Sequence, residues 1–311
     1  MTSCFLRILT RHGTIVLALG LLSGIVFPAV ATFLRPSLPV AVAVILTLAM
    51  LRVDWQRMLD YGRRPVLMSS ALAWYLIGAP VVVWWIVTIL DVPAGLAGGL
   101  IMMAAAPPLM GTPAVALLIG LDVDMSMIHV TVAHLLVFFT APFVALELLG
   151  LELAIDSWAL AGRLGLIIGL SLVAGLVGRR LMGSERLERW KGEIDGLAVI
   201  VLVVFGIAIM DGVTALLLSD PEWIAIMTVV AFVANLALQG AGALMFGGLG
   251  MQAALTAGFM TGNRNMALFL AALPATTHPD ILLYFAIGQL PMYCLPALLK
   301  PVYSRLLPER A

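Results

Sequence analysis

The stretch "AAAPPLMGTPAV" at residues 104–115 carries three prolines within seven residues inside a long apolar run. Proline has no backbone N–H to donate, and its ring clashes with the preceding helical turn, so a helix cannot pass through this stretch unbroken. A second stretch, "TAGFMTGNRNMA" at residues 256–267, places Asn263, Arg264 and Asn265 side by side in another apolar run, just after two glycines. The two stretches predict two interrupted helices.

The composition around these stretches indicates a membrane protein. The 311 residues are 62% hydrophobic and 11% charged, whereas a soluble domain carries about 25% charged residues. About 20 apolar residues span a bilayer as a helix, so we predict an all-α integral membrane protein with ten transmembrane helices and no soluble domain. The expected spans are about 13–34, 38–53, 65–90, 94–119, 127–149, 159–177, 196–218, 223–246, 253–273 and 280–299.

The basic residues predict the orientation of these spans. Fourteen lysines and arginines fall on the side of both termini, whereas only Arg35 and Arg163 fall on the other. Because cytoplasmic loops carry the excess of basic residues, we expect both termini to be cytoplasmic, in a bacterial inner (plasma) membrane. The apolar run from Gly13 is interpreted as the first span and not as a signal peptide. The net charge of zero gives no indication of binding to nucleic acid. The two cysteines, Cys4 and Cys294, lie far apart in the sequence, and we infer no metal site from them.

Ten spans divide into repeat one, about 13–149, and repeat two, about 159–299, within a single membrane transporter domain. Because each half has an odd number of spans, the second half enters the membrane in the opposite sense, which makes the pair an inverted repeat. The two interrupted spans are the fourth members of their halves. Paired, interrupted spans at matching positions are typical of secondary transporters and indicate the binding site, where freed backbone groups become ligands.

The motifs "APPLMGTPAVALLIGLD" (106–122) and "GNRNMALFLAAL" (262–273) resemble those of the bile acid:sodium symporter family, a group of ten-helix carriers. The resemblance implies that spans four and nine cross near the membrane midplane and hold sodium ions beside the substrate. It also implies a core of spans 3–5 and 8–10 against a panel of spans 1, 2, 6 and 7. The family's glutamate, however, falls at Met260, its glutamine at Arg264, and its Ser-Asn pair roughly at Pro113 and Ala114. Most side-chain sodium ligands are therefore absent.

Arg264 stands out because an arginine at the centre of a span costs about 2.5–3.5 kcal/mol on insertion scales. We hypothesise that it is a built-in positive charge where relatives bind sodium. It would either neutralise the crossing helices or bind an anionic substrate together with Thr112, Pro113, Asn263 and Asn265. The alternative is a structural arginine, paired with a carboxylate or with the orphan carbonyls of the broken helix.

Four further polar residues lie within predicted spans. Asn235 and Gln239 share one face of span eight at i, i+4, and they are candidates for either substrate binding or hydrogen bonds between helices. His134 is a candidate for ion coupling because histidine titrates near neutrality, with helix packing as its alternative. Asp211 is a second coupling candidate, and pairing with Arg264 or facing the outer water are its alternatives.

These features together predict a secondary active transporter that moves a small organic anion by alternating access and needs no cofactor. Sodium and protons both remain open as coupling ions. The expected partners are the organic anion and the lipid bilayer, and the oligomeric state is open. The alternatives are an intramembrane enzyme or a channel-like protein. We expect no enzyme, because the sequence has no H-E-x-x-H, G-x-S-x-G or Walker-type motif.

Overall fold

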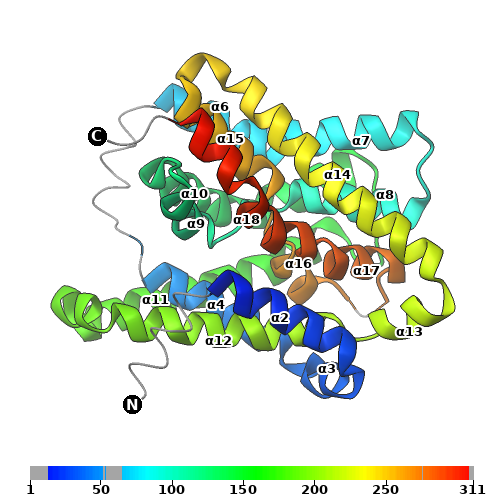
Figure 1. Ribbon diagram of the computed structural model, residues 1–311, viewed down its shortest axis with the longest axis horizontal. Helices are drawn as coiled ribbons and strands as arrows, with labels where there is room; N and C mark the ends of the chain where they lie inside the picture. The colour runs from blue at the N-terminus through cyan, green and yellow to red at the C-terminus, as the bar shows by residue number, and fades with distance from the viewer. Residues whose placement is uncertain (1–12, 52, 54–64, 275, 308–311) are drawn as a thin grey trace. The chain divides into compact units, whose positions relative to one another are not determined.

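The computed structural model describes residues 13–51, 53, 65–274 and 276–307, and these residues form helices joined by short connections (Figure 1). The chain forms two compact units. Unit 1 takes its described residues from Met1–Val53 and Leu166–Ile226, and unit 2 from Asp54–Gly165 and Met227–Ala311. Each unit therefore combines an early and a late part of the sequence.

Unit 1 is built around one helix, α12, on which three others pack. Gly24 in the first of these lies so close to α12 that a Cβ atom there would come within 2.6 Å of the carbonyl oxygen of Ile207. Small residues allow such close approach of membrane helices. The unit contains α2 (Gly13–Val26), α3 (Pro28–Leu34), η1 (Arg35–Ser37), α4 (Leu38–Leu51), most of α11 (Ser157–Arg189), α12 (Lys191–Ile209), α13 (Val213–Ser219) and the start of α14 (Pro221–Met245).

Unit 2 holds both interrupted segments. Its first helix contains a π-helical turn, η2, and its helices α7 and α17 pack on α8 while α10 packs on α9 and α15. Besides the rest of α11 and α14 it contains α6 (Pro65–Ala73), η2 (Trp74–Gly78), α7 (Ala79–Ile89), α8 (Ala94–Ala105), α9 (Thr112–Ile119), α10 (Val123–Pro142), η3 (Phe143–Leu148), η4 (Gly247–Leu249), α15 (Met251–Gly262), α16 (Ala267–Ala272), α17 (Pro279–Ile287) and α18 (Gln289–Leu306).

Among the described residues, seven helical segments are long and apolar enough to cross a membrane, which fits an all-α membrane protein. They are Pro28–Leu51, Val66–Ile89, Val123–Leu148, Ser157–Arg189, Lys191–Ser219, Pro221–Met245 and Pro279–Leu306. The three expected spans without a counterpart of this length are the first, fourth and ninth. The first is divided before Pro28, which cannot continue α2. The fourth and ninth are divided into α8 and α9 and into α15 and α16, which confirms the two predicted interruptions.

The charged segment 183–195, which falls between the sixth and seventh expected spans, is helical and not a loop. α11 continues to Arg189 and α12 begins at Lys191. Trp190 between them leaves helical geometry, at φ −99° and ψ 10°, as does Gly183 within α11, at φ 73° and ψ 161°. Its sequence "SERLER" is rich in good helix formers, and charge alone does not end a helix. Several residues used for the orientation lie outside the described residues: Arg7, Arg11, Arg52, Arg57, Arg63, Arg64 and Arg310, as does Cys4.

Candidate functional site

The two interruptions meet in unit 2 and satisfy each other's backbone. The N–H of Leu109, between α8 and α9, donates to the carbonyl of Asn263, between α15 and α16, at 2.8 Å. In return, the N–H of Asn265 donates to the carbonyl of Pro107, also at 2.8 Å. These bonds bracket a short antiparallel bridge. Backbone freed at membrane depth must find such partners, so each break is completed by the other.

Arg264 lies in this bridge and is fully buried. Its Nε donates to the carbonyl of Thr261 at 2.6 Å. Its Nη1 donates to the carbonyls of Tyr75 and Ala106, each at 3.0 Å. Its Cζ also lies 5.8 Å from the centre of the Tyr75 ring, within the range of a cation–π contact. The guanidinium thus joins α15, α8 and η2.

All three acceptors are carbonyls that a helix interruption has left without a helical donor. The Ala106 and Thr261 carbonyls lie at the C-terminal ends of α8 and α15, where the helix dipole is negative and backbone acceptors are unpaired. Tyr75 lies in the π turn, where the N–H of Ala79 reaches back five residues. The next residue, Pro80, has no N–H that could reach Tyr75 in the same register. These contacts are the ones that the structural alternative describes, in which the arginine pairs with carbonyls freed by a broken helix.

Three buried polar side-chain atoms at these interruptions have no hydrogen-bond partner within the described part of the chain. They are Nη2 of Arg264, Oδ1 of Asn263 and Oγ1 of Thr112. Thr112 is tied to the bridge because its N–H donates to the carbonyl of Leu109 at 2.9 Å. Buried polar atoms are nearly always paired, so these three atoms are the donors and acceptors still available near the interruptions within the described residues.

Pro113 and Asn265 serve the site in different ways. Pro113 is half-buried near the start of α9, where its missing N–H costs nothing, so it starts the second half of the interrupted segment. Asn265 donates through Nδ2 to Nε2 of His134 at 2.8 Å. Nδ1 of His134 faces the carbonyl of Val130 at 2.8 Å and must carry a hydrogen there. His134 is therefore a neutral acceptor that orients Asn265.

Asn235 and Gln239 form a hydrogen-bonded chain between helices. Nδ2 of Asn235 donates to the carbonyl of Gly262 at 2.9 Å, and Nε2 of Gln239 donates to Oδ1 of Asn235 at 2.7 Å. The hydroxyl of Tyr303 in α18 donates to Oε1 of Gln239 at 2.8 Å. This geometry favours the interhelical alternative for both residues, because it ties α18 and α14 to the end of α15.

Asp211 belongs to unit 1, where it forms an ion pair. Its Oδ2 accepts from Nη1 of Arg35 at 2.8 Å and its Oδ1 from the hydroxyl of Thr32 at 2.6 Å. Pairing with Arg264, one of the alternatives for Asp211, is therefore not what the structure shows. The reason is local: α12 ends at Ile209 and η1 begins at Arg35, so both charges lie at helix ends in the same unit.

Sequence reasoning missed the contribution of the third span. Tyr75 supplies both a carbonyl and a ring to Arg264, and its neighbour Trp74 donates through Nε1 to Oγ1 of Thr261 at 3.1 Å. The available signal was Pro80, a proline in the middle of an apolar segment, which frees a carbonyl a turn earlier. A tyrosine in an apolar run gives no such signal by itself.

The profile of the sodium bile acid symporter family matches residues 39–220, which is more than half of the chain. The chain belongs to the sodium bile acid symporter family. The matched range includes the stretch 104–115 and ends before the stretch 256–267, which contains Arg264. No curated protein matches the chain. Family membership and the apolar helices identify an integral membrane protein, and transport is the activity that this family supports.

Proposed function

We propose that this family member is a secondary active transporter of a small organic anion and that it works by alternating access without sodium at the crossing of its interrupted helices. The observation that carries the proposal is the guanidinium of Arg264 on three orphan carbonyls. In transporters with broken helices, carbonyls at half-helix ends coordinate the coupling cation. In this protein the N–H groups of the Arg264 guanidinium already donate to carbonyls of this kind. The fixed positive charge of Arg264 would also repel a second cation.

The anionic character of the substrate follows from the polar atoms that remain. Nη2 of Arg264 and the hydroxyl of Thr112 are donors, and both are buried and unpartnered within the described residues. A carboxylate accepts from a guanidinium more strongly than a neutral group does. Oδ1 of Asn263 is an acceptor and suits a hydroxyl or ammonium group of the same small molecule.

We further propose the full topology of ten spans in two inverted five-helix repeats, with both termini cytoplasmic in a bacterial inner membrane. The charge bias supports the orientation. The expected panel spans fall in unit 1 and the expected core spans in unit 2, apart from the ends of α11 and α14. We therefore assign unit 2 as the core and unit 1 as the panel.

Sodium replacement tests this proposal directly. Purified protein is reconstituted into proteoliposomes, and uptake of radiolabelled small carboxylates is measured in NaCl and in choline chloride. We expect saturable uptake that unlabelled substrate inhibits and that choline leaves unchanged. Strict dependence on sodium would overturn the built-in charge, and uptake without saturation would indicate a channel.

Arg264→Gln provides the second arm. The change restores the family's side chain but removes the fixed charge. Losing a charge-assisted hydrogen bond costs about 1.5–3 kcal/mol, so the affinity for the carboxylate should fall about 10- to 150-fold. Binding is measured by isothermal titration on protein that still elutes as a single folded species. Unchanged affinity in such protein would assign Arg264 to the helix ends alone.

A further inference from the structure

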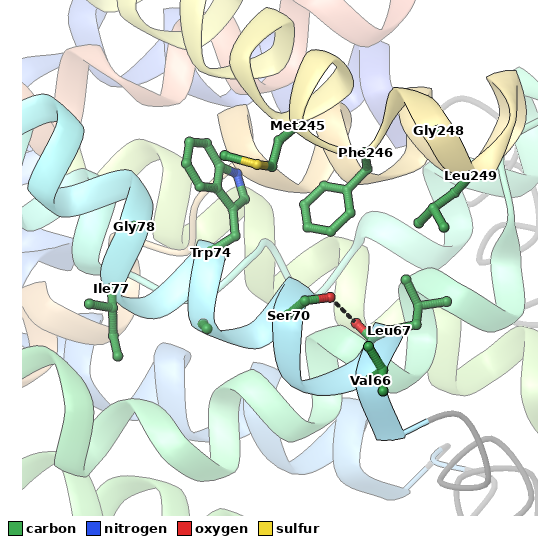
Figure 2. Close-up of a pocket in the computed structure, with 11 residues that line it drawn as sticks. Val66, Leu67, Ser70, Trp74, Ile77, Gly78, Met245, Phe246, Gly248 and Leu249 are labelled. Carbon is green, nitrogen blue, oxygen red and sulfur yellow. Dashed lines mark hydrogen bonds between the residues drawn. The ribbon is translucent and has the colours of Figure 1, made fainter.

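Unit 2 contains an open pocket of about 1110 Å³ that the proposed transport site does not use. Figure 2 shows it between the π-helical turn with its preceding helix and the end of α14 with η4. Its volume slightly exceeds the usual range for ligand pockets in proteins, about 300–1,000 Å³. The lining residues are Val66, Leu67, Ser70, Ala73, Trp74, Ile77, Gly78, Met245, Phe246, Gly248 and Leu249.

The pocket lining offers hydrocarbon and almost nothing else. Only Ser70 and Trp74 carry polar side-chain atoms, and both are already bonded within the protein. The hydroxyl of Ser70 donates to the carbonyl of Leu67 at 3.1 Å (Figure 2), and the indole N–H of Trp74 donates to Thr261. A polar ligand would lose its hydrogen bonds to water on entering such a pocket without replacing them. The occupant must therefore be apolar along its length.

The pocket has the depth of one leaflet of a bilayer. It begins at Val66, close to the start of α6, and reaches Gly78, so it extends over about 18 Å at 1.5 Å per residue. Half of the hydrocarbon core of a bilayer is about 15 Å. Val66, Met245 and Leu249 at its rim are among the exposed large hydrophobic residues. In a membrane protein such side chains face lipid.

We propose that this pocket binds one aliphatic acyl chain of a bilayer lipid and that Trp74 transmits its occupancy to Arg264. Trp74 lines the pocket and bonds to Oγ1 of Thr261, whose carbonyl accepts from Nε of Arg264 at 2.6 Å. Trp74 is followed directly by Tyr75, whose carbonyl accepts from Nη1. Two adjacent residues of one π turn therefore connect the pocket with the buried guanidinium.

A second contact follows the same route. The ring of Phe246, which lines the pocket, lies 6.5 Å from the ring of Tyr75. An acyl chain packed against Trp74 and Phe246 would hold both aromatic side chains and, through them, the π turn. The bound acyl chain would then stabilise the arrangement of carbonyls around Arg264. This inference requires no particular transported solute.

Photolabelling tests the site. The protein is reconstituted in vesicles of phosphatidylcholine that carries a diazirine on one acyl chain, and the labelled peptides are identified by mass spectrometry after irradiation. We expect labelling concentrated on the segments 66–78 and 245–249, above that of other exposed apolar positions such as Leu170 and Val173. Equal labelling at all exposed apolar positions would overturn the site.

Two adjacent serines of α6 supply matched variants. Ser70 lines the pocket and Ser69 does not, yet both are exposed and both hydroxyls donate to a carbonyl three residues earlier. We expect Ser70→Phe to fill the pocket and abolish the concentrated labelling, whereas Ser69→Phe leaves it unchanged. Ala73→Phe fills the pocket from a second position and replaces Ser70→Phe should that variant not fold. Concentrated labelling in both pocket variants contradicts the proposal.

Trp74→Phe tests the connection to Arg264. The change keeps an aromatic wall but removes the N–H that reaches Thr261. We expect added phosphatidylcholine to raise the thermal stability of the wild type in detergent, and we expect Trp74→Phe to lose this gain while its photolabelling persists; absence of the gain in the wild type would overturn the connection to Arg264. Retention of that full gain in Trp74→Phe would show that the acyl chain is bound without acting on the site.

Discussion

Arg35 in unit 1 and Arg264 in unit 2 show two ways of placing a cation in a membrane protein. The side chain of Arg35 is 59% exposed and pairs with the carboxylate of Asp211 at a helix end. Arg264 is fully buried, and its acceptors among the described residues are three backbone carbonyls. The first charge is satisfied by another charge and by water. The second is satisfied by the partial negative charges of interrupted helices, so its environment exists only because those helices are broken.

The difference teaches that the cost of a buried charge depends on whether the buried groups around it lack hydrogen-bond partners. Three orphan carbonyls and an isolated guanidinium would each be unfavourable at membrane depth. Together they complete one another. The Arg35–Asp211 pair is open to its surroundings mainly on the arginine side, because the Asp211 side chain is 12% exposed. An exposed ion pair contributes about 0.2–1 kcal/mol.

The same substitution at both arginines tests this contrast and should give the largest effect. Arg264→Met keeps the apolar stem but leaves three buried carbonyls without donors, at about 1–3 kcal/mol each, so at least about 3 kcal/mol of stability should be lost. Arg35→Met should cost less than about 1 kcal/mol. The free energy of unfolding is measured in mixed detergent and SDS micelles. Equal losses at the two positions would remove the distinction between the two environments.

The backbone around Arg264 gives a second, smaller effect. A Cβ atom at Gly262 would lie 2.5 Å from the carbonyl oxygen of Asn235 and from Cγ of Gln239, whereas one at Gly240 on α14 meets nothing within 4 Å. Gly262→Ala should therefore cost about 1–3 kcal/mol by overpacking. Gly240→Ala is the control and should be neutral or stabilising, by up to about 1 kcal/mol, because alanine favours the helix. A harmless Gly262→Ala would mean that the end of α15 can shift, so that Arg264 is not fixed by packing.

A comparison of two buried threonines distinguishes a hydroxyl with a structural role from one that is available to a ligand. Oγ1 of Thr256 accepts from the N–H of Asp122 at 2.9 Å, whereas Oγ1 of Thr112 has no partner within the described residues. Thr256→Val leaves a backbone N–H unpaired and should cost about 1 kcal/mol or more. Thr112→Val should leave stability unchanged or raised and should weaken binding of the carboxylate. Loss of stability with unchanged binding in Thr112→Val would place the substrate elsewhere.

The smallest effect is expected at Asp211. Asp211→Asn keeps an oxygen acceptor for Arg35, replaces the oxygen that faces Thr32 by an amide NH2 that can donate to its hydroxyl, and removes the charge. Because Arg35 is largely exposed, the change should cost no more than about 1 kcal/mol, and the cost should shrink in about 1 M salt, where the Debye length is about 3 Å. Thermal unfolding of both proteins at low and high salt measures this. A large, salt-independent loss would show that this pair, too, is shielded from water.

Local rules predicted the interruptions, whereas the partners of Arg264 depend on contacts that are distant in sequence. Pro107 and Pro108 end their helix by a local rule, whereas Gly258 lies within α15 and only Gly262 stands at its end. Arg264 was identified by its cost in the membrane. Its acceptor at Tyr75, however, lies 189 positions away in the sequence. In the same way, no local pattern selects Arg35 as the partner of Asp211, because the two residues are 176 positions apart.

Pro80 has a consequence for how relatives of this protein can diverge. It removes a backbone donor from the third span, and Arg264 in the ninth supplies the replacement. The two positions are therefore constrained as a pair, because the proline at one position removes the donor that the arginine at the other position supplies. A lineage that exchanges the arginine for glutamine must find another donor for the Tyr75 carbonyl, such as a bound water, or restore an N–H at position 80. We expect sequence covariation between these two positions among relatives of this protein.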